Sequence, residues 1–273
     1  MNWRTPLTLL SAVALCSLGL SGCGLFRGPA RGGSAIDPHT TAVWCGQPTA
    51  LSATLLLKSI DIRGDSTLVT LRLWRAADGR TRLLVTKIDV EVLQLLITSD
   101  GKFTAYAPRS GLHTAGDFNA ATLPAGLADL RLLISEVADG PLAFSLVPHL
   151  SKSSGANVAH DARAHDNILV GPVAADVVAT VTLAPDSDEV REKILRDAHG
   201  NLLYQLRYRD YRAYDDFHRP SKVDGVVADG SSLTAYLRSF EALGDISPER
   251  MRLTIPATAR AVAVTEFLEH LDQ

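Results

Sequence analysis

The chain has few of the features that identify an activity. Its 273 residues contain no P-loop, G-x-G-x-x-G, H-E-x-x-H or G-x-S-x-G sequence, so nothing marks a phosphate loop, a zinc protease or a hydrolase serine. Charge of one sign is not in excess, because 27 basic side chains stand against 30 acidic ones. A balanced chain without a long basic run argues against a nucleic-acid groove. We therefore expect a protein that is not an enzyme, carries no cofactor or metal and binds no nucleic acid.

Long hydrophobic runs are absent after the first residues, so the body of the chain is not expected to cross a membrane as a helix. The one apolar run spans residues 7–20, behind a single charge at Arg4, and is typical of a targeting signal. It leads into Leu-Ser-Gly-Cys ending at Cys23, which resembles the lipobox of bacterial lipoproteins, where the cysteine is acylated and becomes the first mature residue. This favours a signal peptide over residues 1–22 and a lipid on Cys23, rather than a plain secretory signal or a membrane anchor.

The residues after Cys23 indicate where the lipid would hold the chain. Gly24 stands where an aspartate would resemble an inner-membrane retention signal, so we expect the outer membrane, with the domain facing the periplasm. Six of the fifteen residues from 24 to 38 are Gly or Pro, which argues against both helix and central strand. We therefore expect a flexible tether over residues 23–46 and one domain over residues 47–273.

Cysteine is scarce, with three in the chain. Cys16 would leave with the signal and Cys23 would carry lipid, so Cys45 would be alone and no disulfide could form. No neighbouring residue suggests a catalytic partner for Cys45, and a buried inert thiol is the favoured interpretation.

From residue 51 onward the pattern is one of strands and tight turns. Asp-Gly at 78 and 100 and His-Gly at 199 lie between β-like runs and predict antiparallel hairpins. Val69, Leu71 and Leu73 would share one face, and the run from Leu84 through Ile88 and Val90 to residue 92 would share the inward face of a second strand. The alternation slips at Leu93, which predicts a bulge and a strongly bent sheet. Further strands are expected over 177–183, 190–196 and 202–209 and near 223–227 and 233–240.

Two segments are predicted to be helices and one is predicted to be a loop. Pro124 suits a first turn, apolar residues follow at helical spacing to Val137, and Gly140 could end the helix. Residues 264–271 carry a second apolar stripe, and residues 150–167 are predicted to form a long loop.

Arg-Gly-Asp-Ser at 63–66 is interpreted as a hairpin turn rather than as an adhesion or hydrolase motif. The histidines at 160 and 165 lack the further ligands of a metal site.

Several short segments carry a family resemblance when taken in order. These are residues 97–108, with Asp-Gly in a turn and Tyr-x-Pro at the end, residues 193–197, residues 208–211 and residues 253–256. Together they resemble the LolA/LolB lipoprotein carrier superfamily. The resemblance implies an α+β, mainly β fold: a curved antiparallel sheet forming an incomplete barrel, closed by helices, around an apolar cavity that receives acyl chains.

On this resemblance we expect a lipoprotein that binds the acyl chains of lipid or of another lipoprotein and acts in lipoprotein localisation or lipid transfer. The candidate lining residues are Leu71, Leu73, Leu84, Ile88, Val90, Leu95, Ile97, Leu202, Leu206 and Tyr208. Leu112 or Phe118 would present an exposed apolar contact to the membrane. The alternative is an anchored structural scaffold that binds an envelope protein, which predicts a filled interior instead of a cavity.

Overall fold

The computed structural model describes residues 50–118, 124–138, 157–161, 166–174, 177–184, 189–215 and 217–271. The predicted signal peptide, the lipidation site Cys23, the tether and Cys45 lie outside the described residues, as does the predicted helix end at Gly140.

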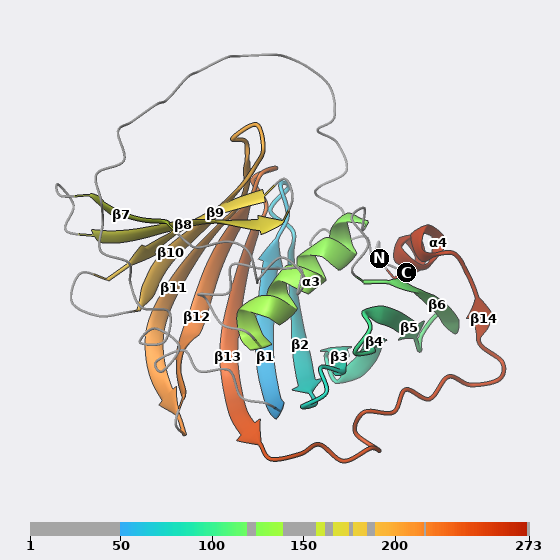
Figure 1. Cartoon of the computed structure of the whole chain (residues 1–273). Coiled ribbons are helices and arrows are strands. Elements are labelled where there is room, and N and C mark those ends of the chain that lie inside the picture. The colour runs from blue at the N-terminus through green and yellow to red at the C-terminus, as the bar shows by residue number, and fades with distance from the viewer. Residues whose placement is uncertain are drawn as a thin grey trace.

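In the described part of the chain the strands form one sheet of 14, in the order β14-β6-β5-β4-β3-β2-β1-β13-β12-β11-β10-β9-β8-β7. The sheet curls around helix α3 (Figure 1). Its strands are β1 (Ala50–Ile60), β2 (Ser66–Arg75), β3 (Thr81–Lys87), β4 (Val90–Ile97), β5 (Lys102–Ala107), β6 (Leu112–Asp117), β7 (Asn157–Asp161), β8 (Asp166–Ala174), β9 (Val177–Leu183), β10 (Val190–Asp197), β11 (Leu202–Tyr214), β12 (Phe217–Val227), β13 (Ser232–Leu243) and β14 (Arg260–Ala261).

Two runs of hairpins meet at the centre of this sheet. Strands β1 to β6 follow one another in space as they do in sequence, and so do β7 to β13. The antiparallel pairing of β1 with β13, from Ala50 opposite Leu243 to Ile60 opposite Ser232, joins the two runs. The predicted bent antiparallel sheet is confirmed.

The alternation of apolar and polar residues along each strand explains which face of the sheet is shielded from water. In β1 the side chains of Leu51, Ala53, Leu55 and Leu57 are buried, while Lys58 is exposed. Across the β1 and β2 pair, Leu55 lies opposite Leu71, so that leucines meet leucines on the inner face. A period of two residues therefore builds the core from every second position.

The predicted hairpin turns are present. Gly79, Gly101 and Gly200 have φ of 89°, 84° and 83°, a conformation that glycine adopts without a Cβ penalty. At the last of these turns Asp197 accepts hydrogen bonds from the backbone N–H groups of His199 and Asn201, both at 2.8 Å. The segment 63–65 is also part of a hairpin turn, between β1 and β2, in which the N–H of Gly64 donates to Asp61 O at 3.0 Å, and Ser66 begins β2.

The run from residue 81 to 97 is two strands, not the single bent strand expected. A tight turn at Ile88 and Asp89, with φ of 50° and 60°, separates β3 from β4. The predicted irregularity near Leu93 is present as a shift in register opposite Val85. It is Leu83 and Val85 that face inward, while Leu84 lies on the other face.

Both predicted helices are present, as α3 (Ala125–Ala138) and α4 (Val264–His270). The loop predicted over 150–167 is wrong in part, because β7 pairs with β8 across it, from Asn157 opposite Val170 to Asp161 opposite Asp166. Near the C-terminal end of the chain, β14 pairs in parallel with β6, with Arg260 opposite Leu112. Within the described residues, no helix combines the length and the hydropathy that a bilayer crossing requires.

Candidate functional site

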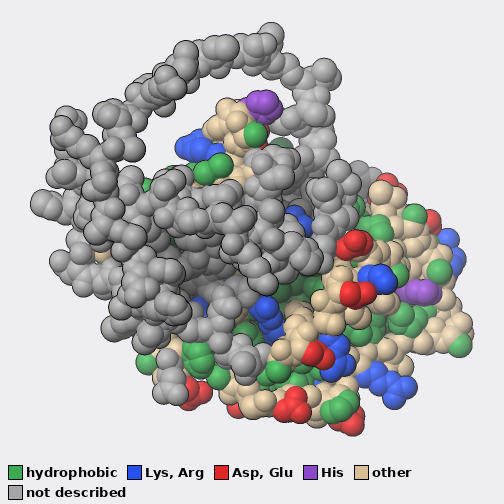
Figure 2. All heavy atoms as spheres, viewed as in Figure 1, with side chains coloured by type: hydrophobic (Ala, Val, Ile, Leu, Met, Phe, Trp, Pro, Cys, Tyr) green, Lys and Arg blue, Asp and Glu red, His purple; other side chains and the backbone are tan. Residues whose placement is uncertain are grey.

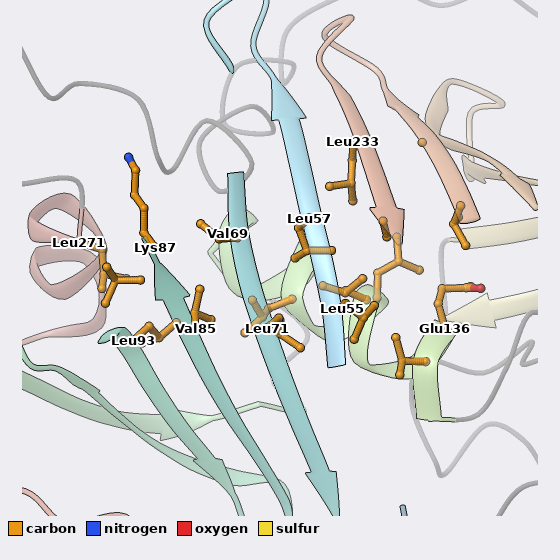
Figure 3. Close-up of a pocket in the computed structure, with 18 of the residues that line it drawn as sticks. Leu55, Leu57, Val69, Leu71, Val85, Lys87, Leu93, Glu136, Leu233 and Leu271 are labelled. Atoms are coloured by element: carbon orange, nitrogen blue, oxygen red, sulfur yellow. The ribbon is translucent and has the colours of Figure 1, made fainter. Parts of the chain in front are cut away.

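A cavity of about 710 Å³ lies between the inner face of the sheet and helix α3. Figure 3 shows its lining side chains projecting from β1, β2, β3 and β13 and from both helices. The volume falls within the roughly 300–1,000 Å³ of sites that hold small organic ligands. The structure therefore leaves an apolar cavity between the sheet and α3.

Most of the lining is aliphatic. The sheet contributes Leu55, Leu57 and Leu71, and helix α3 faces them with Leu133 and Val137. The apolar residues of the lining are Leu55, Leu57, Val69, Leu71, Val85, Val92, Leu93, Ala107, Leu112, Leu130, Leu132, Leu133, Val137, Leu206, Pro220, Val223, Val226, Val227, Leu233, Ala235, Leu237 and Leu271. Such a surface contacts a hydrocarbon chain more favourably than it contacts water.

Two small residues line the cavity on the C-terminal half of the sheet. Gly225 lies inside β12, where an added Cβ would stand 3.2 Å from Leu206 Cδ2. Ala235 lines the cavity from β13, opposite Leu57 of β1. A side chain at position 225 would press on Leu206, whereas a larger side chain at position 235 would project into the cavity.

A polar cluster occupies one end of the cavity, where α3 crosses β10 and β11. Lys193 Nζ donates to Glu136 Oε1 at 2.6 Å, and Tyr208 Oη donates to Glu136 Oε2 at 2.6 Å. The three residues lie on three different elements, and the side chains of Lys193 and Glu136 are 2% and 8% exposed. Burial, followed by the nearby Glu136 charge, raises the pKa of Tyr208 well above its usual value. The cluster thus fixes the helix against the sheet with all three groups partnered.

Arg219 places a buried cation in the lining. The residue is 2% exposed on β12, and its guanidinium lies 5.2 Å from the centre of the Phe240 ring. A cation over an aromatic face gains electrostatic attraction from the ring.

The sequence-predicted lining residues divide into three groups. Leu71, Leu206 and Tyr208 do line the cavity. The second group is buried in packed core or borders a separate void of about 10 Å³, and comprises Leu73, Leu95 and Ile97. The third group lies away from the lining, with Leu84 and Leu202 partly exposed, Val90 51% exposed and Ile88 85% exposed. Ile88 and Val90 are outside because the turn at 88–89 ends β3 before they can face inward.

The predicted membrane-contact residues need correction. Leu112 and Phe118 are 4% and 5% exposed, so neither presents an apolar surface to a membrane. Leu112 lines the cavity, and Phe118 packs edge-to-face on Phe103 with ring centres 6.0 Å apart. Ile88 is instead an exposed apolar side chain close to the cavity.

Sequence reasoning missed the contribution of helix α3 and of the polar cluster. The sequence predicts an apolar stripe on α3, but it does not indicate which strands that stripe packs against. Lys193 carried a signal, because it lies two residues before Leu195 and shares the inward face of β10 with it. A lysine on a dry face requires a buried acidic partner, and Glu136 is that partner.

Comparisons with known proteins identify solved structures with a similar fold. No family model matches the chain, and neither does any curated protein. A solved domain described as an outer membrane lipoprotein-sorting protein from Vibrio parahaemolyticus is similar with a TM-score of 0.55 and 14% identity, over 78% of this chain and 94% of that one. A LolA superfamily protein from Nitrosomonas europaea gives 0.54 and 10% identity over 78% and 94%, and a DUF1329 family protein from Desulfovibrio piger gives 0.53 and 10% over 76% and 91%.

These similarities define the class of fold. The curved antiparallel sheet wrapped around a helix is a LolA/LolB-like fold, as the sequence resemblance predicted. In this chain the fold encloses an aliphatic cavity of about 710 Å³.

Proposed function

We propose that this protein is an outer-membrane lipoprotein that binds the acyl chains of lipid, or of an acylated protein, within its cavity. The observation that carries the proposal is the hollow, aliphatic interior between α3 and the sheet. The two solved LolA-like neighbours support it, since one is described as a lipoprotein-sorting domain and the other as a LolA superfamily protein.

Transfer by such a cavity needs no covalent step. Each methylene that leaves water for an apolar site contributes about 0.8 kcal/mol, and an acyl chain passes between a bilayer and the cavity with little net change in that term. Differences in affinity between donor, cavity and acceptor then set the direction. The function proposed is therefore carriage or reception of lipid in lipoprotein localisation or lipid transfer.

The lipid on Cys23 and the tether would keep the domain beside the outer membrane, on its periplasmic side. Ile88, 85% exposed at the β3–β4 turn, would provide apolar contact with the bilayer surface from which the cargo comes. Radiolabelled palmitate incorporated by the wild-type chain and lost in Cys23→Ser would support the anchor, and equal labelling of the two would contradict it.

The scaffold alternative predicts that the interior is filled and that the protein carries no lipid. A cavity of this size favours the binding proposal over the scaffold. A protein partner of the envelope remains compatible with lipid binding, because it would contact the outer surface.

The proposal is tested by measuring lipid in protein purified from membranes with mild detergent. Native mass spectrometry is expected to detect bound acyl lipid in the wild type, and much less in Ala235→Trp, whose indole would occupy the cavity. Ala115→Trp is the matched control, because Ala115 is an exposed residue of β6 outside the lining. Lipid-free wild type that also fails to take up added lipid would contradict the proposal.

A further inference from the structure

The most exposed large apolar side chains in the described part of the chain all lie at one end of the sheet. Those that are at least 40% exposed are Ile62, Leu68, Ile88, Val90, Val178 and Val226. They come from separate parts of the chain, namely the β1–β2 hairpin, the β3–β4 hairpin, the start of β9 and the end of β12. We call these residues the apolar rim.

Strand register shows that the apolar rim occupies a single end. Ile60 at the end of β1 lies opposite Ser232 at the start of β13, and Ser232 also lies opposite Val226 of β12. Because neighbouring strands are antiparallel, the β3–β4 turn reaches the same end as the β1–β2 turn. Val178 lies opposite Arg196, next to the β10–β11 turn, which the same alternation of strands places at this end. Figure 2 shows hydrophobic side chains next to polar ones at the top of the view, where hairpin turns lie in Figure 1.

The cavity lies toward the same end of the sheet. On β1 it is lined by Leu55 and Leu57, whereas Leu51 and Ala53, nearer the opposite end, belong to the packed core. Figure 3 shows β1 running from Leu55 through Leu57 toward the apolar rim. The same division holds on β2, β3 and β4, where the lining includes Val69, Leu71, Val85, Val92 and Leu93 but not Leu73, Leu83 and Leu95. Val226 belongs both to the lining and to the apolar rim, so the two surfaces are continuous.

Folding gains little from the side chains of the apolar rim. Ile88 is 85% exposed and has a φ of 50°, a conformation that is strained for a β-branched residue. Ile62 is 70% exposed, and its neighbour Arg63 has a side chain that is 62% exposed. Apolar residues that bury little surface in the folded chain, one of them at a conformational cost, indicate a contact outside that chain.

The spacing of the apolar rim favours a lipid surface over a folded protein as this outside contact. Between β4 and β12 the sheet has five strand spacings, which at about 4.8 Å each extend over about 24 Å along the sheet. Hairpin ends this far apart, with exposed charged residues such as Arg63, Asp65 and Asp89 beside them, can each enter the interfacial layer of a bilayer, whose lipids adjust around them. A protein partner would instead need a complementary buried area of about 1,200–2,000 Å².

The predicted tether is long enough for this end of the domain to face the membrane. Ala50 begins β1 at the end opposite the apolar rim, and the 11 residues of β1 extend over about 34 Å. Residues 24–49 would span up to about 90 Å if fully extended, and a flexible chain of that length spans about 28 Å on average. A lipid on Cys23 and an apolar rim on the same bilayer are therefore compatible.

We infer that the apolar rim is a membrane-docking surface, so that the domain stands end-on against a lipid bilayer with its cavity facing the lipids. This inference rests on the proposed function and deepens it. It adds the β1–β2 hairpin and Val226 to the contact proposed for Ile88, and it fixes the direction from which an acyl chain enters. The aliphatic side chains lie among the lipid head groups, and an acyl chain passes from bilayer to cavity without crossing bulk water.

The test measures which end of the full-length lipidated protein contacts the bilayer. The protein is reconstituted in vesicles of dioleoylphosphatidylcholine that contain a phospholipid with a nitroxide quencher on its acyl chain. The fluorophore NBD is attached to Leu68→Cys or, as the matched control, to Ala77→Cys, each in a Cys45→Ser background. Ala77 is an exposed residue of the β2–β3 turn, at the opposite end of the sheet. We expect strong quenching at position 68 and little at position 77, and equal quenching at the two positions would overturn the inference.

A second measurement uses added charge in place of a label. Ile62→Glu with Leu68→Glu is expected to slow transfer of a fluorescent phospholipid from vesicles to the protein by about tenfold, because a carboxylate resists entry into the apolar part of a bilayer. The control, Ala77→Glu with Ser99→Glu, adds the same charge at exposed positions of two turns at the opposite end and should keep the rate within about twofold. An equal loss of rate in the two variants would overturn the inference.

Binding of the neutral probe N-phenyl-1-naphthylamine separates failure of the docking surface from failure of the proposed function. If the wild type binds the probe but position 68 is not quenched, the docking surface is wrong and acyl-chain binding stands. If the wild type does not bind the probe, the proposed function fails and the inference fails with it.

Discussion

Lys193 on β10 and Glu136 on α3 form a buried ion pair, with Nζ 2.6 Å from Oε1. Their side chains are 2% and 8% exposed, and the second carboxylate oxygen accepts a hydrogen bond from Tyr208. This pair connects the helix that covers the cavity with the sheet that forms its floor. Its loss would affect both folding and the position of α3.

Removing one partner of this pair is expected to destabilise the fold. Lys193→Met would leave Glu136 buried without a cation, so the free energy of unfolding should fall by about 3–5 kcal/mol. Urea denaturation followed by circular dichroism measures this change. Replacing Glu136, Lys193 and Tyr208 together by Leu, Met and Phe should recover most of the loss, because no charge then remains buried. A single variant as stable as the wild type would contradict the prediction.

Tyr208 predicts a loss of stability at alkaline pH. Its pKa is raised in the folded state, first by burial and then by Glu136, so the folded protein retains the phenolic proton after the unfolded chain has released it. The contribution of Tyr208 is therefore fully present below about pH 10 and declines above it, by up to about 1.4 kcal/mol per pH unit for one proton. Urea titrations between pH 8 and 11 should show a shallower decline for Tyr208→Phe. Parallel declines in the two proteins would contradict the assignment.

A hollow interior predicts that two alanines respond differently to enlargement. Ala235 lines the cavity, whereas Ala53 is 1% exposed within the packed core opposite Phe240. Ala53→Leu should destabilise by about 1–3 kcal/mol through overpacking. Ala235→Leu should change the free energy of unfolding by less than about 1 kcal/mol, because space for the added atoms exists. Equal destabilisation would mean that the interior is filled.

The β3–β4 turn predicts a stabilising substitution. Ile88 and Asp89 both have positive φ, as a type I′ turn requires, but a β-branched residue is strained there. Ile88→Asn with Asp89→Gly should raise the free energy of unfolding by about 1 kcal/mol. Thermal denaturation measures this, and Gly79→Ala is the opposite control, since it introduces a Cβ at φ of 89°. A lower melting temperature for the Asn-Gly variant would contradict the turn assignment.

The same Asn-Gly variant is expected to exchange lipid with membranes more slowly. It removes the apolar side chain proposed to contact the bilayer, while the cavity is unchanged. Transfer of a fluorescent phospholipid from donor vesicles to the protein measures the rate, and binding of the neutral fluorescent probe N-phenyl-1-naphthylamine checks that the cavity still binds apolar molecules. An unchanged transfer rate would exclude Ile88 as a membrane contact.

Much of the sheet could be predicted because its signals are local. Gly79 and Gly101 stand at turns that Asp-Gly predicts, and Leu71 and Leu73 lie on the face that alternation gives them. The turn at Ile88 could not be predicted, since a β-branched residue at positive φ is the opposite of the usual turn signal. Leu83, Leu84 and Val85 are all apolar, so periodicity alone could not tell which of them faces inward.

The cavity was harder to predict than the strands around it. A solid core and a lined cavity require the same leucines on the same face, and the difference depends on how far α3 lies from the sheet. Glu136 and Lys193 set that arrangement from positions far apart in the sequence. Their pairing depends on tertiary structure, which no local pattern encodes.

The pairing of β1 with β13 bears on how this protein matures. Ala50 begins the first described strand and its neighbour Leu243 ends the last long one, so the centre of the sheet depends on contacts between distant parts of the chain. Contacts of high sequence separation form slowly and only after synthesis is nearly finished. The centre of the sheet is therefore completed late, and export of the kind proposed above would take place before its two halves pair.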